Sequence, residues 1–252
     1  MRRIATIMGA VGAAAVAWSG AAFASAPDDS AASQPRPHSY QVTLTNITSG
    51  EPLSPGVIAT TSKGSDLHAF QVGGFTSTEL AALAQDGNEA PLVNAYQAAA
   101  ATTDVVDIAA PLTPTSVDKE GFSHSVTSTI QANKGDLLSI ATMLVCSNDG
   151  FTGLDNIALP AGGRTATYWL RAYDAGVENN TELGSDLPDP CSAVGPTTLP
   201  GDPNGNIDTG SVGTVPTQPI AGHPGISGSG DLSSAAHGWY GPVARVDITR
   251  LN

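Results

Sequence analysis

Acidic side chains gather in a long segment near the end of the chain that has no lysine or arginine to neutralise them. This segment lies between Arg171 and Arg245. Its carboxylates are Asp174, Glu178, Glu182, Asp186, Asp189, Asp202, Asp208 and Asp231. Like charges repel one another, and Ca2+ prefers hard oxygen ligands. A bound cation is therefore an economical way to stabilise the segment.

Within it, Asp202–Asp208 places an oxygen-bearing side chain at every second position, a spacing found in calcium loops. The glycine that such loops have at the sixth position is replaced by Ile207, and the bidentate glutamate at the twelfth by Gly213. A polar turn without a metal therefore competes here with a second cation site.

Residues that serve catalysis show no recognisable arrangement. The histidines have no spacing of the His-x-x-x-His kind, and the glycines around Ser227 do not have the Gly-x-Ser-x-Gly spacing of a strained nucleophile turn. We expect that the protein is not an enzyme, and a secreted metal-dependent hydrolase is kept only as an alternative.

The chain has two cysteines, Cys146 and Cys191, so only one disulfide pairing is possible. An exported protein meets an environment in which disulfides form. The bridge would close a loop of about 46 residues and stabilise the fold by about 4 kcal/mol. Two free thiols or a zinc pair are the alternatives.

The first residues have the layout of a secretory signal peptide. Arg2 and Arg3 precede an uncharged run over residues 4–23, and a small-x-small cleavage site follows at Ala24–Ala26. We expect residues 1–26 to be removed and the product to be secreted, with the cell surface or periplasm as further destinations. No later run approaches the roughly 20 apolar residues that a membrane-spanning helix needs.

Removal of the leader leaves eight basic residues against 23 acidic ones, a net charge of −15. Nucleic acid and anionic membranes would both be repelled by this charge, so we expect neither as a partner.

Residues 27–38 are rich in Ser, Ala, Pro and Asp, which predicts a disordered tether. Residues 39–252 are predicted to form one domain. Alternation of apolar and polar residues predicts strands at 40–47, 122–132, 137–145, 165–173 and 243–251.

Helical signals are few. Thr76–Glu79 has the form of a capping box, which predicts a helix that ends at Asp86-Gly87, and a second short helix is indicated near 92–100. Many strands with one or two helices predict an all-β fold, an antiparallel β-sandwich. Residues 184–241 are predicted to form a long Gly/Pro-rich loop that is pinned by Cys191 or disordered in part.

Two short blocks resemble the paired signature of the spondin amino-terminal domain family, found in F-spondin and mindin. Ser147–Asp155 (SNDGFTGLD) is similar to the family's Ser-Pro-Asp-Trp-x-Val-Gly-Leu/Ile, and Arg171–Glu178 (RAYDAGVE) is similar to Asp-Ala-Gly-Thr-Asp. Tyr40–Asn46 and Val243–Leu251 resemble the family's first and final strands.

The resemblance implies a C2-like sandwich of about eight strands, with Ca2+ held by loops at one end. The family's ligand aspartates correspond to Asp149, Asp174 and Glu178. Three carboxylates, together with carbonyls and water, suit an ion that takes six to eight oxygens. Gly150, Gly153 and Gly176 are expected to allow backbone conformations closed to other residues. Turn formation without any metal is the alternative.

The sequence thus predicts a secreted, calcium-binding interaction or adhesion module whose partner is an extracellular protein or glycan. A carbohydrate-binding module is the first alternative. The mature chain keeps only Trp169 and Trp239. Two tryptophans are few for stacking against sugar rings unless several aromatic side chains converge.

Overall fold

A computed structural model describes residues 36–187, 190–199 and 218–252. These residues belong to the unit Pro35–Asn252. The predicted signal peptide (1–26), most of the predicted tether and the candidate second cation site at Asp202–Asp208 lie outside the described residues.

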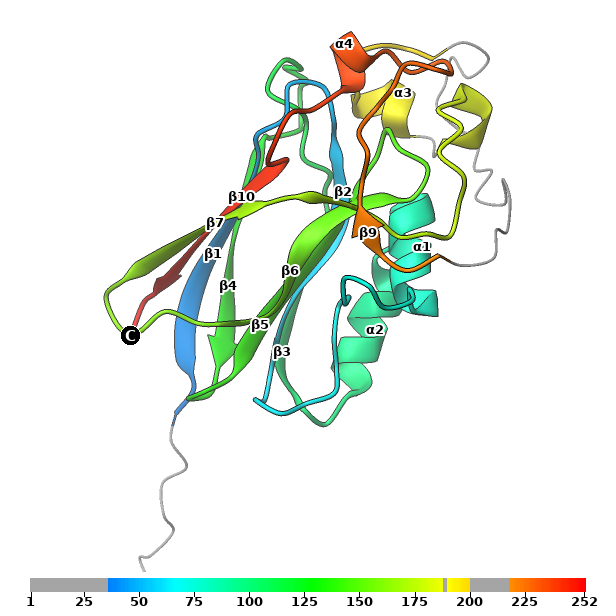
Figure 1. Ribbon diagram of the computed structural model, residues 1–252. Helices are drawn as coiled ribbons and strands as arrows, with labels where there is room; N and C mark the ends of the chain where they lie inside the picture. The colour runs from blue at the N-terminus through cyan, green and yellow to red at the C-terminus, as the bar shows by residue number, and fades with distance from the viewer. Residues whose placement is uncertain (1–35, 188–189, 200–217) are drawn as a thin grey trace, which may run out of the picture. The chain divides into compact units, whose positions relative to one another are not determined.

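Two antiparallel sheets form the framework (Figure 1), which confirms the predicted all-β sandwich. The four-stranded sheet has the order β4 (Ser125–Ala132), β1 (His38–Asn46), β10 (Ala244–Arg250), β7 (Thr165–Leu170). The six-stranded sheet has the order β3 (Thr102–Ile108), β2 (Leu53–Thr61), β5 (Leu137–Leu144), β6 (Gly150–Ala158), β8 (Ala172–Asp174), β9 (Ala221–Gly222). The described residues form ten strands instead of the expected eight, and two of the ten, β8 and β9, are very short.

The main core lies between the two sheets. In β10, Ala244, Val246 and Ile248 are buried while the intervening residues are only partly buried, as the alternation predicts. They pack with side chains of both sheets, such as Val42 and Ile140. Burying one such aliphatic side chain contributes about 1.5–3 kcal/mol, so this layer holds the sheets face to face.

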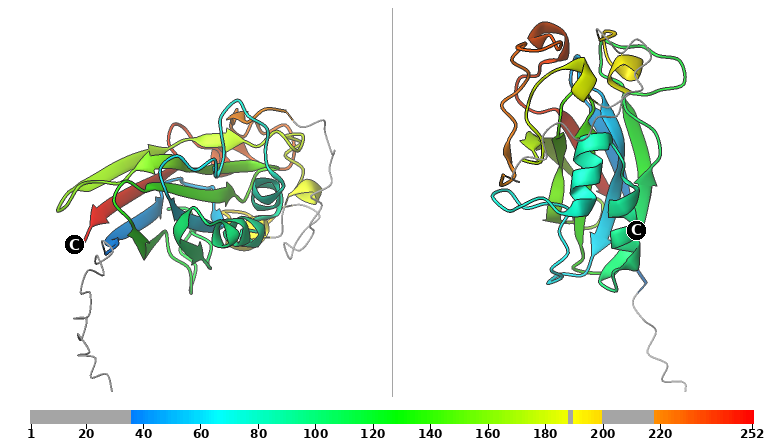
Figure 2. Two further views of the ribbon diagram at one scale, coloured as in Figure 1. Left: turned by 90° about the horizontal axis from the view of Figure 1, so that it is seen from below. Right: turned by 90° about the vertical axis from the view of Figure 1, so that its right-hand side faces the viewer.

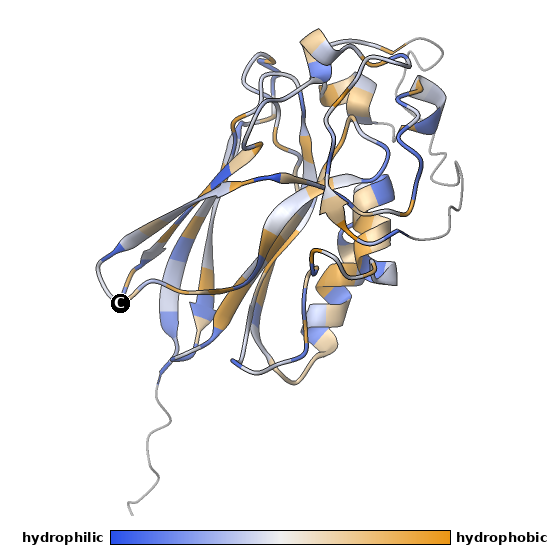
Figure 3. Ribbon diagram, in the orientation of Figure 1, coloured by the Kyte–Doolittle hydropathy of each residue, from blue (hydrophilic) through white to orange (hydrophobic). Residues whose placement is uncertain are grey.

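Helices α1 (Thr78–Asp86) and α2 (Ala90–Ala98) cover the other face of the six-stranded sheet (Figure 2). Their apolar residues, visible in Figure 3, form a second core in which Leu83 and Tyr96 pack with Phe151 of β6. The helix start differs from the predicted one: Ser77 is the N-cap and accepts the Leu80 N–H. The Thr76 hydroxyl instead donates to the Ala175 carbonyl 2.5 Å away.

A third core lies where short elements of the predicted long loop meet one end of the sheets. The short elements described in this loop are η1 (Gly184–Asp186), α3 (Pro190–Val194) and α4 (Ser234–His237), and α3 contributes Cys191 to the third core beside loop residues such as Leu199 and Leu232. The disulfide between Cys146 and Cys191 is present and forms part of this core, which confirms the predicted pairing. The bridge fixes α3 beside the chain that leaves β5.

The strand predicted at 165–173 is divided between the two sheets. β7 pairs with β10 in the four-stranded sheet, whereas β8 pairs with β6 in the six-stranded sheet. Arg171 lies at the division, and its carbonyl accepts a hydrogen bond of 2.8 Å from the Thr152 hydroxyl of β6. The crossing places Asp174, the last residue of β8, beside the start of β6.

Candidate functional site

A tight turn follows β8 and wraps around Asp149. Asp149 is fully buried, and its Oδ2 accepts hydrogen bonds from the backbone N–H groups of Val177 (2.7 Å) and Glu178 (3.0 Å). The Ala175 N–H donates to the Asp149 carbonyl at 3.1 Å. We call Asp149 together with residues 174–178 the acidic turn. One carboxylate thus organises the backbone on which two more stand.

Gly176 allows this turn to form. Its φ is +71°, in the left-handed region that favours glycine, and a Cβ there would lie 2.3 Å from the Gln218 carbonyl oxygen. Gly150 and Gly153 were expected to need unusual backbone conformations as well, and that expectation is wrong, since both lie in β6 and neither has a positive φ. Gly150 lies in β6, and a Cβ on it would instead meet the Ser147 hydroxyl at 2.3 Å.

Asp174 and Glu178 bring their carboxylates to the same turn. Asp174 is opposite Gly150 in the β6–β8 ladder and accepts hydrogen bonds from the Gly176 N–H (2.8 Å) and the Asn180 amide (2.7 Å). Glu178 is 6% exposed, and its Oε1 accepts a hydrogen bond of 3.0 Å from the Gln85 amide of α1. The turn thus connects the three predicted ligands, since Asp149 accepts the Glu178 N–H and Asp174 begins the turn.

Burial makes the charged forms of these carboxylates unfavourable. It raises the pKa of Asp149 to about 6, with help from the charge of Asp174 and against hydrogen bonds from the turn. Burial likewise raises the pKa of Glu178 to about 8, with the charge of Asp149 adding to the effect. In the described part of the chain, ion pairs join His68 to Asp155 and Arg245 to Asp247, and neither pair involves the acidic turn.

The acidic turn offers an oxygen that a cation would bind, but its carboxylates are too far apart to enclose an ion as they stand. Asp149 Oδ1 is buried and has no hydrogen-bond partner among the described residues, so it is an oxygen that a metal would satisfy. The three carboxylates do not place one oxygen each within 4.8 Å of one another. Among the described residues only Cys146, Cys191 and His237 have that spacing, and the disulfide occupies the two sulfurs. A cation would have to draw the carboxylates together or bind some of them through water.

The family-model comparison matches Spondin_N over residues 54–189, more than half of the chain. The chain belongs to the spondin amino-terminal domain family. The match contains Asp149, Asp174 and Glu178, whereas β1 and β10, which also carried the resemblance, lie outside it. No curated protein matches this spondin domain in a sequence search.

The family consists of extracellular domains without enzymatic activity. Among the described residues of this spondin domain, no helix is long and apolar enough to cross a membrane.

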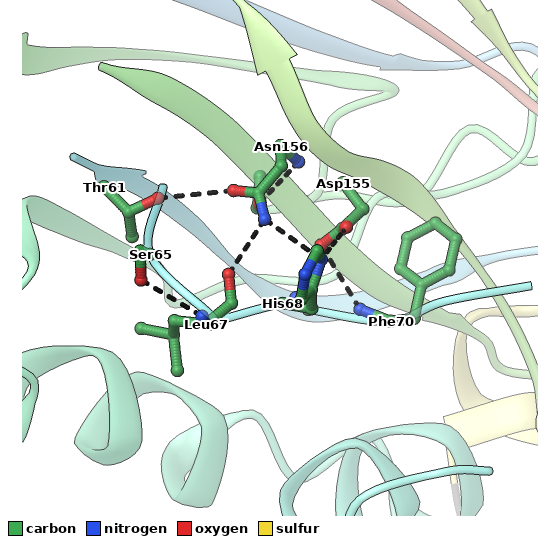
Figure 4. Close-up of polar contacts among 9 residues, drawn as sticks. Thr61, Ser65, Leu67, His68, Phe70, Asp155 and Asn156 are labelled. Carbon is green, nitrogen blue, oxygen red and sulfur yellow. Dashed lines mark hydrogen bonds and ion pairs between the residues drawn. The ribbon is translucent and has the colours of Figure 1, made fainter. Parts of the chain in front are cut away.

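Asp155, at the end of the first signature block, faces a different part of the spondin domain. Its Oδ2 lies 2.5 Å from His68 Nδ1, and its Oδ1 accepts the Ala69 N–H at 2.7 Å. Figure 4 shows Asn156 beside this pair, with its amide 2.9 Å from the Leu67 carbonyl. Asp155 thus anchors the segment before α1 to β6 through hydrogen bonds. Asp155 was not among the predicted metal ligands.

The His68–Asp155 pair resembles the base half of a catalytic triad. The hydrogen bonds of His68 to described residues involve Nδ1, and no described serine, threonine or cysteine side chain bonds to Nε2. A hydrolytic site would need such a nucleophile, so the hydrolase alternative gains no support from this pair.

Glu182 is a key residue of the spondin domain that the sequence did not single out. Its carboxylate accepts the backbone N–H groups of Ser227 (2.6 Å), Gly228 (2.7 Å) and Ser229 (2.8 Å). Burial acts to raise the pKa of Glu182, but these hydrogen bonds outweigh it and the pKa is lowered. The Gly-Ser-Gly-rich sequence around Ser227 could have indicated this contact, since the N–H groups of such turns bind anions.

Proposed function

We propose that this spondin domain is a secreted, calcium-binding extracellular interaction module in which Asp149, Asp174 and Glu178 hold the ion. The observation that carries the proposal is the buried, unpartnered Oδ1 of Asp149. Two further carboxylates stand on the same turn without a lysine or arginine partner among the described residues. The proposed partner is an extracellular protein or glycan.

Each residue has a distinct part in the proposed site. Asp149 uses Oδ2 to hold the turn and keeps Oδ1 for the ion. Asp174 is only partly buried, so it provides the side open to solvent. Glu178 has Oε2 available beyond the oxygen that accepts from Gln85. The ion supplies the positive charge that the acidic turn lacks, and carbonyls and water complete six to eight oxygens.

Burial favours a structural role for the ion. Asp149 is 0% exposed and Glu178 is 6% exposed, so an ion between them would be largely enclosed by protein. An enclosed ion fixes the turn, and through it the neighbouring segments, more readily than it bridges to an outside ligand. We therefore propose that calcium orders this end of the module.

Calcium is expected to raise the melting temperature relative to EDTA. At a free concentration 100 times the Kd, binding contributes about 2.7 kcal/mol. A domain of this size shifts by about 2–4 °C per kcal/mol, so the expected rise is roughly 5–10 °C. Asp149→Asn should lose most of this rise. Its amide oxygen can still accept both turn N–H groups, so the variant is expected to fold.

The matched control is Asp107→Asn, which changes an exposed carboxylate on β3. It should keep the full calcium response. Identical melting curves with calcium and with EDTA, or a full response in Asp149→Asn, would contradict the proposed site. Differential scanning calorimetry makes the measurement.

A further inference from the structure

Two neighbouring hollows share Trp239, Tyr240 and Pro242 in their walls. One has a volume of about 680 Å³ and is also lined by Trp169, Arg171 and His223. The other has a volume of about 440 Å³, and its lining residues include Thr48, Ser49, Thr115 and Ser234. Both volumes lie in the range of about 300–1,000 Å³ that small-molecule sites occupy. We call the two hollows together the aromatic groove.

The aromatic groove presents large rings to solvent. Trp169 is 59% exposed on β7, and Tyr240 is 97% exposed in the loop before β10. Trp239 is half-buried and packs against both the main core between the sheets and the third core, which contains the disulfide, so its position is fixed. Exposed rings that line a hollow are a common feature of binding sites. The convergence that a stacking platform requires is therefore present.

Hydrogen-bond donors stand beside these rings. Arg171 is exposed and forms no ion pair with the described residues. His223 accepts the Gly225 N–H at Nδ1 (3.0 Å), and its ring centre is 5.1 Å from that of Trp239. A ring nitrogen that accepts a hydrogen bond carries no proton, so the ring proton of His223 is on Nε2. That nitrogen has no hydrogen-bond partner among the described residues.

This combination favours a polyhydroxylated ligand. The apolar faces of sugar rings can pack on tryptophan, while sugar hydroxyls can bond to the guanidinium and to hydroxyl side chains. Nucleic acid also stacks on aromatic rings, but a formal net charge of −13 repels it. Proline-rich peptides dock in aromatic grooves as well, yet they offer few hydrogen-bond partners for the Arg171 guanidinium.

We propose that the aromatic groove binds an oligosaccharide, with sugar rings stacked on Trp169 and Trp239 and sugar hydroxyls hydrogen-bonded to Arg171. None of these three residues is a candidate metal ligand. Binding in the groove therefore does not require the proposed calcium site, and the two proposals can fail separately.

The test is an array of immobilised plant, bacterial and animal glycans, probed with the mature protein in calcium and in EDTA. Each hit is then titrated as the soluble oligosaccharide by isothermal titration calorimetry. Trp169→Ala is expected to weaken binding by roughly tenfold, since one stacked ring is lost. Arg171→Gln should weaken it by a smaller factor. Phe75→Ala, which removes a ring that is 68% exposed elsewhere, is the matched control and should bind normally.

Glycan hits that persist in EDTA and weaken in Trp169→Ala would support the proposal. An array without hits would overturn it. Hits that vanish in EDTA and in Asp149→Asn, but not in Trp169→Ala, would place the glycan at the acidic turn instead. Binding of a ten-residue proline peptide that Trp169→Ala abolishes, with no glycan hit, would also overturn it.

Discussion

Replacement of Glu182 by alanine is expected to lower the free energy of unfolding by about 2–4 kcal/mol, and the melting temperature by roughly 5–15 °C. The carboxylate accepts three backbone N–H groups from Ser227–Ser229. Its own carbonyl accepts the N–H groups of Asp231 and Leu232. Because residues 227–229 are exposed, water replaces part of what the carboxylate supplied. The loss of unfolding free energy is therefore smaller than for a carboxylate whose hydrogen-bond partners are all buried.

Glu182→Gly is expected to destabilise the protein less than Glu182→Ala, by about 1 kcal/mol. Both variants lose the carboxylate, but Glu182 has a φ of +57°, a left-handed conformation in which a Cβ is strained. Alanine keeps that strain and glycine removes it. The order reverses the usual preference for alanine over glycine.

Urea unfolding of both Glu182 variants and of Glu120→Gln measures these differences. Glu120 is exposed, so its variant should match the parent protein. An alanine variant as stable as the parent would show that the carboxylate does not hold the turn. A glycine variant less stable than the alanine variant would contradict the strained backbone at Glu182.

Stability is expected to fall as pH rises from about 4.5 to 8 when calcium is chelated. The pKa of Asp149 is raised to about 6 and that of Glu178 to about 8, so the folded protein binds more protons than the unfolded chain in this range. Stability then decreases with increasing pH. At about 1.4 kcal/mol per pKa unit, the two shifts alone correspond to about 8 kcal/mol. Burial lowers the pKa values of His223 and His237, which acts in the opposite direction, so a smaller net loss of about 2–5 kcal/mol is expected.

Glu178→Gln should remove much of this pH dependence and be more stable than the parent protein at pH 8.5 in EDTA. Calcium should flatten the parent's pH dependence, because a cation favours the ionised carboxylates. At pH 7, where Glu178 is largely protonated, calcium binding should release about one proton. Calorimetry in buffers of different ionisation enthalpy counts that proton. A stability that rises with pH in EDTA, or calcium binding without proton release, would contradict these pKa shifts.

The sequence predicts strands well where one face is buried and poorly where both are. β10 alternates buried and partly buried residues and was predicted nearly to its ends. β2 was missed because almost every residue from Leu53 to Thr61 is buried and Pro55 interrupts the run. β6 was interpreted as a loop since Gly150 and Gly153 suggested turns. A Cβ at Gly153 would lie 2.0 Å from the Ile140 carbonyl oxygen, so the neighbouring strand is what requires this glycine.

The sequence indicated the two blocks that carry the candidate ligands, but it did not indicate what surrounds them. Two signature blocks placed Asp149, Asp174 and Glu178 together, and the β6–β8 pairing is what brings them to one turn. Glu182 bonds to residues 45 to 47 positions further along the chain, and no local pattern carries that information. The aromatic groove likewise combines Trp169 of β7 with Trp239 of a distant loop, so its convergence depends on the complete topology.

A crystal structure grown in millimolar calcium, with the ion located by its anomalous scattering, tests the central claim most directly. The claim predicts one peak about 2.3–2.6 Å from Asp149 Oδ1, with Asp174 and Glu178 bound directly or through water. An ordered acidic turn without a peak, or a calcium peak only at another place on the domain, would contradict it.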